Sequence, residues 1–154
     1  MRVSAGILLY RQPGEGLQVL LAHPGGPLFA KRDEGHWTIP KGEPEPDEPL
    51  FDAAQREFAE ETGQPLPDGS LVDLGSITQK GGKVVHAWAL EGDLDPETAR
   101  SETFELEWPP KSGTLQSFPE IDRVAWFAPD EARRRLKETQ SPFIDRLEEA
   151  LATD

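Results

Sequence analysis

The chain segment between Pro49 and Gly63 restricts the possible folds most strongly, because its pattern predicts one amphipathic helix. Phe51, Ala54 and Phe58 recur at positions i, i+3 and i+7, which is the spacing of a single buried stripe. A helix with one apolar face must pack against another layer of secondary structure. The rest of the chain therefore has to supply a sheet or further helices to cover this face.

Both ends of this helix are marked by residues with defined terminal roles. Asp47 can act as the N-cap, and Pro49 suits the first turn, where a missing backbone N–H costs nothing. Gly63 lies just beyond the last turn, where a residue in the left-handed conformation commonly closes a helix. We therefore expect the helix to begin after Asp47 and to end before Gly63.

Short apolar segments bounded by glycine, proline and polar clusters predict strands on both sides of the helix. They are Val3 to Tyr10, Leu17 to His23, Leu71 to Thr78, Lys83 to Leu90, Phe104 to Trp108 and Asp122 to Phe127. A final helical region opens at Pro129 and restarts at Pro142. This order predicts an α/β fold in which helices cover a mixed sheet. No repeat or linker-like break interrupts it, so we expect a single domain over residues 1–154.

The composition of the 154-residue chain narrows its chemistry. The absence of cysteine excludes disulfides, a thiol nucleophile and thiolate metal ligands, so any metal must bind oxygen or histidine. The formal net charge of −13 argues against nucleic acid or an anionic membrane as a partner, since such binding needs a large basic face. The sequence has no signal-peptide pattern and no apolar stretch near the roughly 20 residues that span a bilayer. A cytoplasmic location is the expectation that follows.

Three glutamates on the expected helix form the first candidate site. Glu57, Glu60 and Glu61 occupy positions i, i+3 and i+4, so their carboxylates share one side of the helix. Like charges at this spacing destabilise a helix by roughly 0.2 to 0.5 kcal/mol per pair unless a cation is present. Carboxylates without sulfur or histidine companions suit hard ions such as Mg²⁺ or Mn²⁺. The alternative is an acidic helix face that is simply solvated.

The spacing around these glutamates resembles a known family signature. Gly42 is followed by five residues and Glu48, and then by seven residues and the run from Arg56 to Gly63, which reads REFAEETG. This resembles the Nudix box of the Nudix (MutT-like) hydrolase superfamily, G-x5-E-x7-R-E-U-x-E-E-x-G-U, where U is a bulky aliphatic residue. Phe58 and Gln64 depart from the two U positions, and we interpret both as packing variations. The resemblance implies the Nudix α/β/α sandwich with a mixed sheet.

The resemblance also implies roles for individual residues. Glu57, Glu60 and Glu61 would bind Mg²⁺ or Mn²⁺, with the Gly42 carbonyl as a further ligand. Arg56 would orient a carboxylate by ion pairing, and Glu48 is more often a supporting residue than a ligand in this family. The implied reaction is metal-assisted hydrolysis of a diphosphate linkage, in which Glu60 and Glu61 also act catalytically.

A further acid, distant in the sequence, is expected as the general base or as an extra metal ligand. Glu120 is the best candidate, because several Nudix subfamilies carry an acid just before their last strand. The run EIDRVAW, which begins at Glu120, resembles that arrangement. Glu102, Glu105 and Glu107 are rivals. Glu105 and Glu107 alternate along an expected strand and could simply face water.

The residues just before Gly42 point to the substrate. The run from His36 to Gly42, HWTIPKG, resembles the W-x-x-P-K-G run of dinucleoside polyphosphate hydrolases and diphosphoinositol polyphosphate hydrolases. The candidate substrate-binding residues are Lys41, Lys83 and Trp37. Trp37 is also well explained as core, and Lys83 as the end of a two-glycine hairpin that begins at Lys80.

We therefore expect an enzyme that binds a small nucleotide-like substrate, with dinucleoside polyphosphates favoured over nucleoside triphosphates and nucleoside diphosphate sugars. The tyrosine that many bacterial dinucleoside polyphosphate hydrolases carry after the box is missing, since residues 80 to 82 read KGG. The alternatives are a catalytically silent nucleotide-binding regulatory Nudix module and a plain interaction domain with an acidic surface. The sequence leaves the oligomeric state open, a homo-oligomer included.

Overall fold

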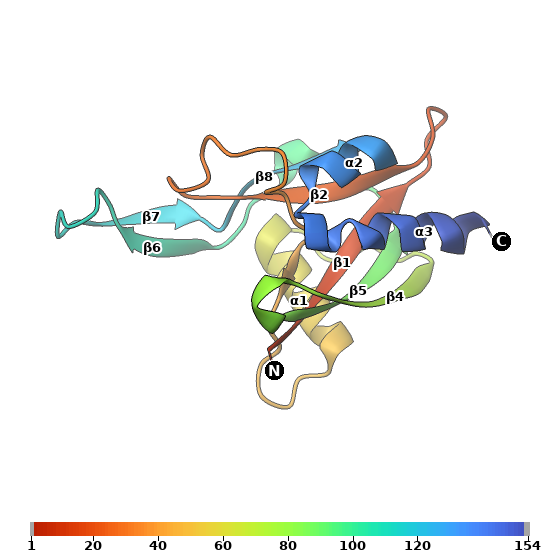
Figure 1. Ribbon diagram of the computed structural model, residues 1–154, viewed down its shortest axis with the longest axis horizontal. Helices are drawn as coiled ribbons and strands as arrows, with labels where there is room; N and C mark the ends of the chain where they lie inside the picture. Colours follow the sequence, from red (N-terminus) through yellow and green to blue (C-terminus); the bar gives the residue numbers. More distant parts are fainter. Residues whose placement is uncertain (1, 153–154) are drawn as a thin grey trace.

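Residues 2–152 are described by a computed structural model, shown in Figure 1. The strands are β1 (Val3–Arg11), β2 (Gln18–Pro24), β3 (Lys41–Gly42), β4 (Leu71–Thr78), β5 (Val84–Glu91), β6 (Thr103–Glu107), β7 (Leu115–Pro119) and β8 (Ile121–Phe127). The α-helices are α1 (Leu50–Thr62), α2 (Pro129–Arg135) and α3 (Pro142–Ala152), and short 3₁₀ turns are η1 (Lys80–Gly82), η2 (Pro96–Thr98) and η3 (Glu138–Gln140). In this part of the chain no helix has the length and apolar character needed to cross a membrane.

The central sheet is mixed, as the element order predicts. Its strands follow the order β4-β5-β1-β2-β8, and β3 pairs with β1 beside that path. The β1–β5 pair is parallel, whereas β1 is antiparallel to β2 and β3, β4 to β5, and β2 to β8. The antiparallel pairing places Gly42 of β3 opposite Ala5 at the start of β1.

Helices cover both faces of this sheet, which confirms the predicted α/β fold with helices on either side (Figure 1). One core cluster joins α1 to β1, β2 and β5, and it includes the fully buried Phe58 and Ala54. The other lies beneath α2 and α3, where Phe143, Ile144 and Leu147 are buried. Burial of one such large side chain contributes about 1.5 to 3 kcal/mol, so these contacts fix α1 firmly against the sheet.

The observed ends of α1 confirm one terminal prediction and correct the other. Gly63 closes the helix with a left-handed φ of 72°, and its N–H donates to the Ala59 carbonyl. The Asp47 N-cap was wrong: Pro49, in extended conformation, is the cap residue, and no side chain caps the helix there. Asp47 lies two residues before Pro49, too far upstream to reach the first helical N–H groups, and itself has a φ of 64°.

A two-stranded hairpin, β6–β7, projects from the body of the molecule (Figure 1). The sequence predicts its first strand but not the second, because Leu115–Pro119 has only two large apolar residues and ends in proline. The Phe104 and Phe118 rings pair across the strands, 6.1 Å apart. Glu105 is exposed, as its alternation predicts, and Glu107 is an exposed residue whose carboxylate accepts backbone N–H groups at the hairpin turn.

Candidate active site

The three box glutamates lie on one side of α1, and two of them, Glu57 and Glu60, share a single arginine. The Arg56 Nη1 donates to Glu57 Oε1 at 3.0 Å and to both Glu60 oxygens at 3.2 Å. The side chains of Glu57 and Glu60 are 15% and 31% exposed, so both carboxylates remain accessible from one direction. Arg56 thus reduces the repulsion within the cluster and holds the carboxylates in place.

Glu48 anchors this arginine from the opposite side. Its two carboxylate oxygens accept from Arg56 Nε and Nη2, each at 3.0 Å, which is the bidentate geometry that favours an Arg–carboxylate pair. The Glu45 backbone N–H also donates to Glu48 at 2.9 Å. The pKa of Glu48 is lowered by the guanidinium. Glu48 is therefore occupied in positioning Arg56, which agrees with the supporting role that the family resemblance implies.

Glu61 is the most deeply buried of the glutamates. It is 8% exposed, and within the described residues its Oε1 has no hydrogen-bond partner. Burial, with the Glu57 carboxylate as the next cause, raises the pKa of Glu61 to about 8. Burial and the Glu60 carboxylate also raise the pKa of Glu57. A carboxylate in this position costs free energy unless a cation or proton neutralises it.

Gly42 makes room for the Glu57 carboxylate. A Cβ atom at residue 42 would lie 2.0 Å from Glu57 Cδ and 2.3 Å from each of its carboxylate oxygens. The antiparallel pairing of β3 with β1 holds the Gly42 backbone at this point. The carboxylate therefore occupies the space of the missing side chain, and the backbone of Gly42 forms one wall of the glutamate cluster.

The distant acid Glu120 lies beside this cluster. The Glu102 N–H donates to the Glu60 carbonyl, and the Glu120 N–H donates to the Glu102 carbonyl, both at 2.9 Å. The base of the β6–β7 hairpin is thus tied to the C-terminal part of α1. Burial, Glu102 and Glu60 raise the pKa of Glu120, and the Glu120 charge in turn raises the pKa values of Glu57 and Glu61.

These residues fit a divalent cation site, although among residues 2–152 no three acidic or histidine side chains already surround a common point. Arg56 draws Glu57 and Glu60 towards itself in this arrangement. The unpartnered Glu61 oxygen and the carboxylates with raised pKa values are nevertheless oxygen donors without enough compensating positive charge. Such a donor set matches the preference of Mg²⁺ and Mn²⁺.

If Glu120 is the general base that the sequence predicts, Glu120→Gln lowers kcat by about 10² to 10⁴-fold while changing KM far less, because a general base acts only in the transition state. The measurement is steady-state hydrolysis on the preferred substrate, with Glu102→Gln as the matched variant from the same hairpin base. Full activity in Glu120→Gln would remove Glu120 from the site. A larger loss in Glu102→Gln would transfer the role to that residue.

The second part of the site is a group of lysines. Lys41, the predicted phosphate contact, lies directly before Gly42, and burial lowers its pKa to about 8, with Lys83 and Lys137 contributing through their charges. The charges of Glu61 and Glu57 act in the opposite direction on Lys41, so the lysines adjoin the carboxylate cluster. The sequence singled out Lys41 and Lys83 but missed Lys137, which follows Leu136 after the end of α2 and carries no motif.

Trp37 is a core residue and not a stacking surface for a substrate, so its place among the substrate-binding candidates was wrong. It is 2% exposed, and its Nε1 donates to Asp33 Oδ1 at 2.7 Å. Its ring packs edge-on against His23 and Phe127, with centroids 5.1 and 5.0 Å away. The alternative interpretation of Trp37, as part of the core, is confirmed.

A buried glutamine that no sequence pattern indicated joins the lysine-bearing segments. Gln140 is fully buried, and its Oε1 accepts from the Ile39 N–H at 3.0 Å. Its Nε2 donates to Thr38 Oγ1 and to Gln79 Oε1, both at 2.9 Å. No spacing rule in the sequence links residues 38, 79 and 140, so only the fold reveals this contact.

With the fold and the site described, comparison with known proteins defines the class. The family model described as NUDIX domain matches residues 1–147, and the chain belongs to that family.

Solved structures of the same fold include a binary complex of the C. elegans Ap4A hydrolase, 18% identical, with a TM-score of 0.68 over 98% of this chain and 99% of that one. The NUDIX domain of Shewanella oneidensis NrtR, complexed with ADP ribose, is 17% identical, with a TM-score of 0.66 over 98% of this chain and 88% of that one. The C-terminal domain of mouse MUTYH, in complex with human PCNA, is 16% identical, with a TM-score of 0.61 over 99% of this chain and 90% of that one.

Proposed function

We propose that this chain is a metal-dependent pyrophosphohydrolase that acts, as a single domain, on a diphosphate linkage in a nucleoside polyphosphate or nucleoside diphosphate derivative. The observation that carries the proposal is the buried, unpartnered Glu61 oxygen within a cluster that also holds Glu57, Glu60 and Glu120. A cluster of this kind in a hydrolase family is best explained by Mg²⁺ or Mn²⁺ and an anionic substrate.

Each residue of the cluster has a task in such a reaction. Glu57, Glu60 and Glu61, with the Gly42 carbonyl, would hold the cations, which when bound supply charge neutralisation and a more acidic water. Arg56 holds the Glu57 and Glu60 carboxylates in position through hydrogen bonds to both. Glu120, whose pKa is raised, accepts the proton from the attacking water. Lys41 binds a phosphate oxygen through its ammonium group.

Dinucleoside polyphosphates are the favoured substrate class. The HWTIPKG run resembles that of dinucleoside polyphosphate hydrolases, and the C. elegans protein with the same fold is an Ap4A hydrolase. ADP-ribose, the ligand of the NrtR NUDIX domain, represents the shorter class with a single diphosphate. The lysines beside the carboxylates favour the more highly charged substrate.

The experiment is incubation with Mg²⁺ or Mn²⁺ and a panel of diadenosine polyphosphates, nucleoside triphosphates, ADP-ribose and nucleotide sugars. Phosphate and mononucleotide products are followed, with Glu60→Gln as the inactive variant and the exposed Glu105→Gln as its matched control. We expect cleavage by the wild type and by Glu105→Gln, and a loss of about 10²-fold or more in Glu60→Gln. Equal cleavage by wild type and Glu60→Gln would refute the assignment of the site.

A catalytically silent, nucleotide-binding regulatory module is the second candidate. It is favoured by the NrtR and MUTYH structures, in which the same fold is seen with a bound nucleotide or with a protein partner. This candidate predicts tight binding of a panel nucleotide, measured by calorimetry, with no turnover at saturating Mg²⁺ or Mn²⁺. Turnover that is lost in Glu60→Gln would exclude it.

A further inference from the structure

In an otherwise strongly acidic protein, Lys41, Lys83 and Lys137 are close enough for their charges to act on one another, and Lys80 lines a pocket together with Lys137. Burial and the neighbouring lysines lower the pKa of Lys41, and burial and Lys83 lower the pKa of Lys137. Within residues 2–152, the ammonium groups of Lys41, Lys80, Lys83 and Lys137 form no hydrogen bond or ion pair. Mutual repulsion among these cations costs stability, and the Glu61 and Glu57 charges offset it in part at Lys41 without forming an ion pair.

The lysines come from three separate segments that Gln140 joins. Its amide contacts residue 39, two residues before Lys41, and Gln79, one residue before Lys80. Gln140 itself follows Lys137 by three residues, and the Lys137 N–H donates to the Trp37 carbonyl at 2.9 Å. The grouping of positive charge is therefore fixed by the fold and does not depend on chance positions of long side chains.

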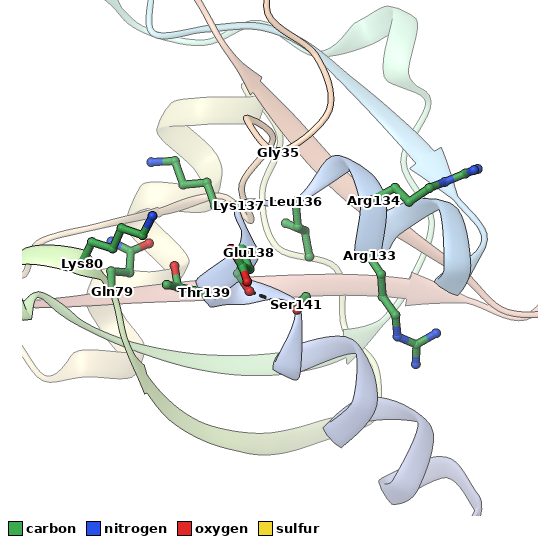
Figure 2. Close-up of a pocket in the computed structure, with 10 residues that line it drawn as sticks. All are labelled: Gly35, Gln79, Lys80, Arg133, Arg134, Leu136, Lys137, Glu138, Thr139 and Ser141. Atoms are coloured by element: carbon green, nitrogen blue, oxygen red, sulfur yellow. Dashed lines mark hydrogen bonds between the residues drawn. The ribbon is translucent and has the colours of Figure 1, made fainter.

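A pocket of about 560 Å³ lies beside these lysines. Figure 2 shows that Lys80 and Lys137 extend towards the same side of it, whereas the Arg133 and Arg134 side chains point away from that side. Arg133 is paired with Asp130, Asp145 and Glu148, and Arg134 with Glu131. The positive charge available to a ligand in this pocket is therefore that of Lys80 and Lys137, against the Glu138 carboxylate that also lines it.

We infer that the pocket bordered by Lys80 and Lys137 binds the distal phosphates of an extended polyphosphate, whose scissile linkage lies at the carboxylate cluster. Lys41, which interacts electrostatically with Lys137 as well as with Glu61 and Glu57, would contact the intervening phosphates together with Lys83. The inference rests on the proposed function, and it selects substrates with three or more consecutive phosphates over those with a single diphosphate. Each ammonium group offers three donors, which suits a flexible chain of phosphate oxygens better than one rigid group.

The first test measures binding without catalysis. Inorganic tripolyphosphate is titrated calorimetrically into the protein in EDTA, and the wild type is compared with Lys137→Gln, Lys80→Gln and Lys111→Gln. Lys111 lies in the turn of the projecting β6–β7 hairpin, so Lys111→Gln removes a lysine charge away from the pocket. We expect the Kd for tripolyphosphate to rise about tenfold in Lys137→Gln, somewhat less in Lys80→Gln, and not in Lys111→Gln. Equal affinity in all four proteins would overturn the inference.

The second test measures selectivity. The kcat/KM for diadenosine tetraphosphate should fall about tenfold in Lys137→Gln, whereas the value for ADP-ribose should stay within about twofold. An equal loss on both substrates would overturn the inference but leave the hydrolase intact. Lysine-dependent tripolyphosphate binding without cleavage of any nucleotide would instead retain the binding site and refute the proposed function.

Discussion

Glu61→Gln should abolish hydrolysis and at the same time make the metal-free protein more stable at pH 8. The expected loss of kcat is about 10² to 10⁴-fold, because the variant lacks a carboxylate at the most buried position of the cluster. The gain in stability is expected because the folded protein holds this carboxylate in poor solvent contact and near Glu57.

The direction of the pH effect follows from the pKa of Glu61. Its value rises from 4.5 to about 8 on folding, so between these values the folded state retains a proton that the unfolded chain has lost. The free energy of unfolding therefore falls as pH rises from about 4.5 to 8, and the full cost applies above pH 8. Removal of the carboxylate should recover on the order of a few kcal/mol at pH 8 and nothing near pH 4.5.

Thermal unfolding between pH 5 and 8.5, either in EDTA or with Mn²⁺ in place of EDTA, measures the effects of pH and of the cation on stability. Wild-type stability should fall across this range and recover with Mn²⁺, since a ligand of the folded state stabilises it by mass action. Glu61→Gln should show a flatter profile and a smaller response to Mn²⁺, and the exposed Glu105→Gln should behave like the wild type. A less stable Glu61→Gln protein at pH 8 would show that the carboxylate is favourable where it lies.

Gly42→Ala should leave the fold almost intact and still reduce turnover by about 10²-fold. The new Cβ would lie 2.0 Å from Glu57 Cδ, so the carboxylate has to move. The obstructing atoms belong to the end of a flexible side chain, which can turn aside at a cost within about 1 kcal/mol. Displacement of a catalytic group by about 1 Å is sufficient for a rate loss of this size.

Gly14→Ala is the matched control for this substitution, because Gly14 lies in the β1–β2 turn with no atom within 4 Å of an added Cβ. The two variants should have similar melting temperatures, whereas only Gly42→Ala should lose activity and affinity for Mn²⁺. Turnover within about twofold of wild type in Gly42→Ala would mean that the position of the Glu57 carboxylate does not matter for the reaction.

Local signals predicted the fold well where they were strong. The β4 strand has the predicted bounds, Leu71–Thr78, and α1 ends at the predicted Gly63. The Asp47 N-cap was wrong because capping preference ranks residue types and carries no information on the backbone conformation before the helix. Strand β7 was missed since its stability comes from pairing with β6, a non-local contact that its own residues do not encode.

The part of the candidate site that lies on α1 and β3 was predictable from the sequence. Helical spacing grouped Glu57, Glu60 and Glu61, and the family signature added Arg56 and Gly42. The placement of Glu120 beside them depends on hydrogen bonds that tie the hairpin base to α1, over a separation of some sixty residues. Lys137 and Gln140 were missed because they come close to the other site residues only when the segment after α2 packs against the loop before Gly42.

The contact made by Gln140 brings a lysine from the C-terminal part of the chain next to a site whose acids come from earlier residues. Every acid of the candidate site lies at or before residue 120, whereas Lys137 and the glutamine that organises the lysines come from the last strand–helix segment of the chain. Exchange of residues 128–152 between relatives would therefore replace Lys137 and Gln140, while Lys41, Lys80, Lys83 and the acids of the candidate site would stay in place. In this architecture, one part of the proposed phosphate-binding surface can change at a single junction without any change in the acidic cluster.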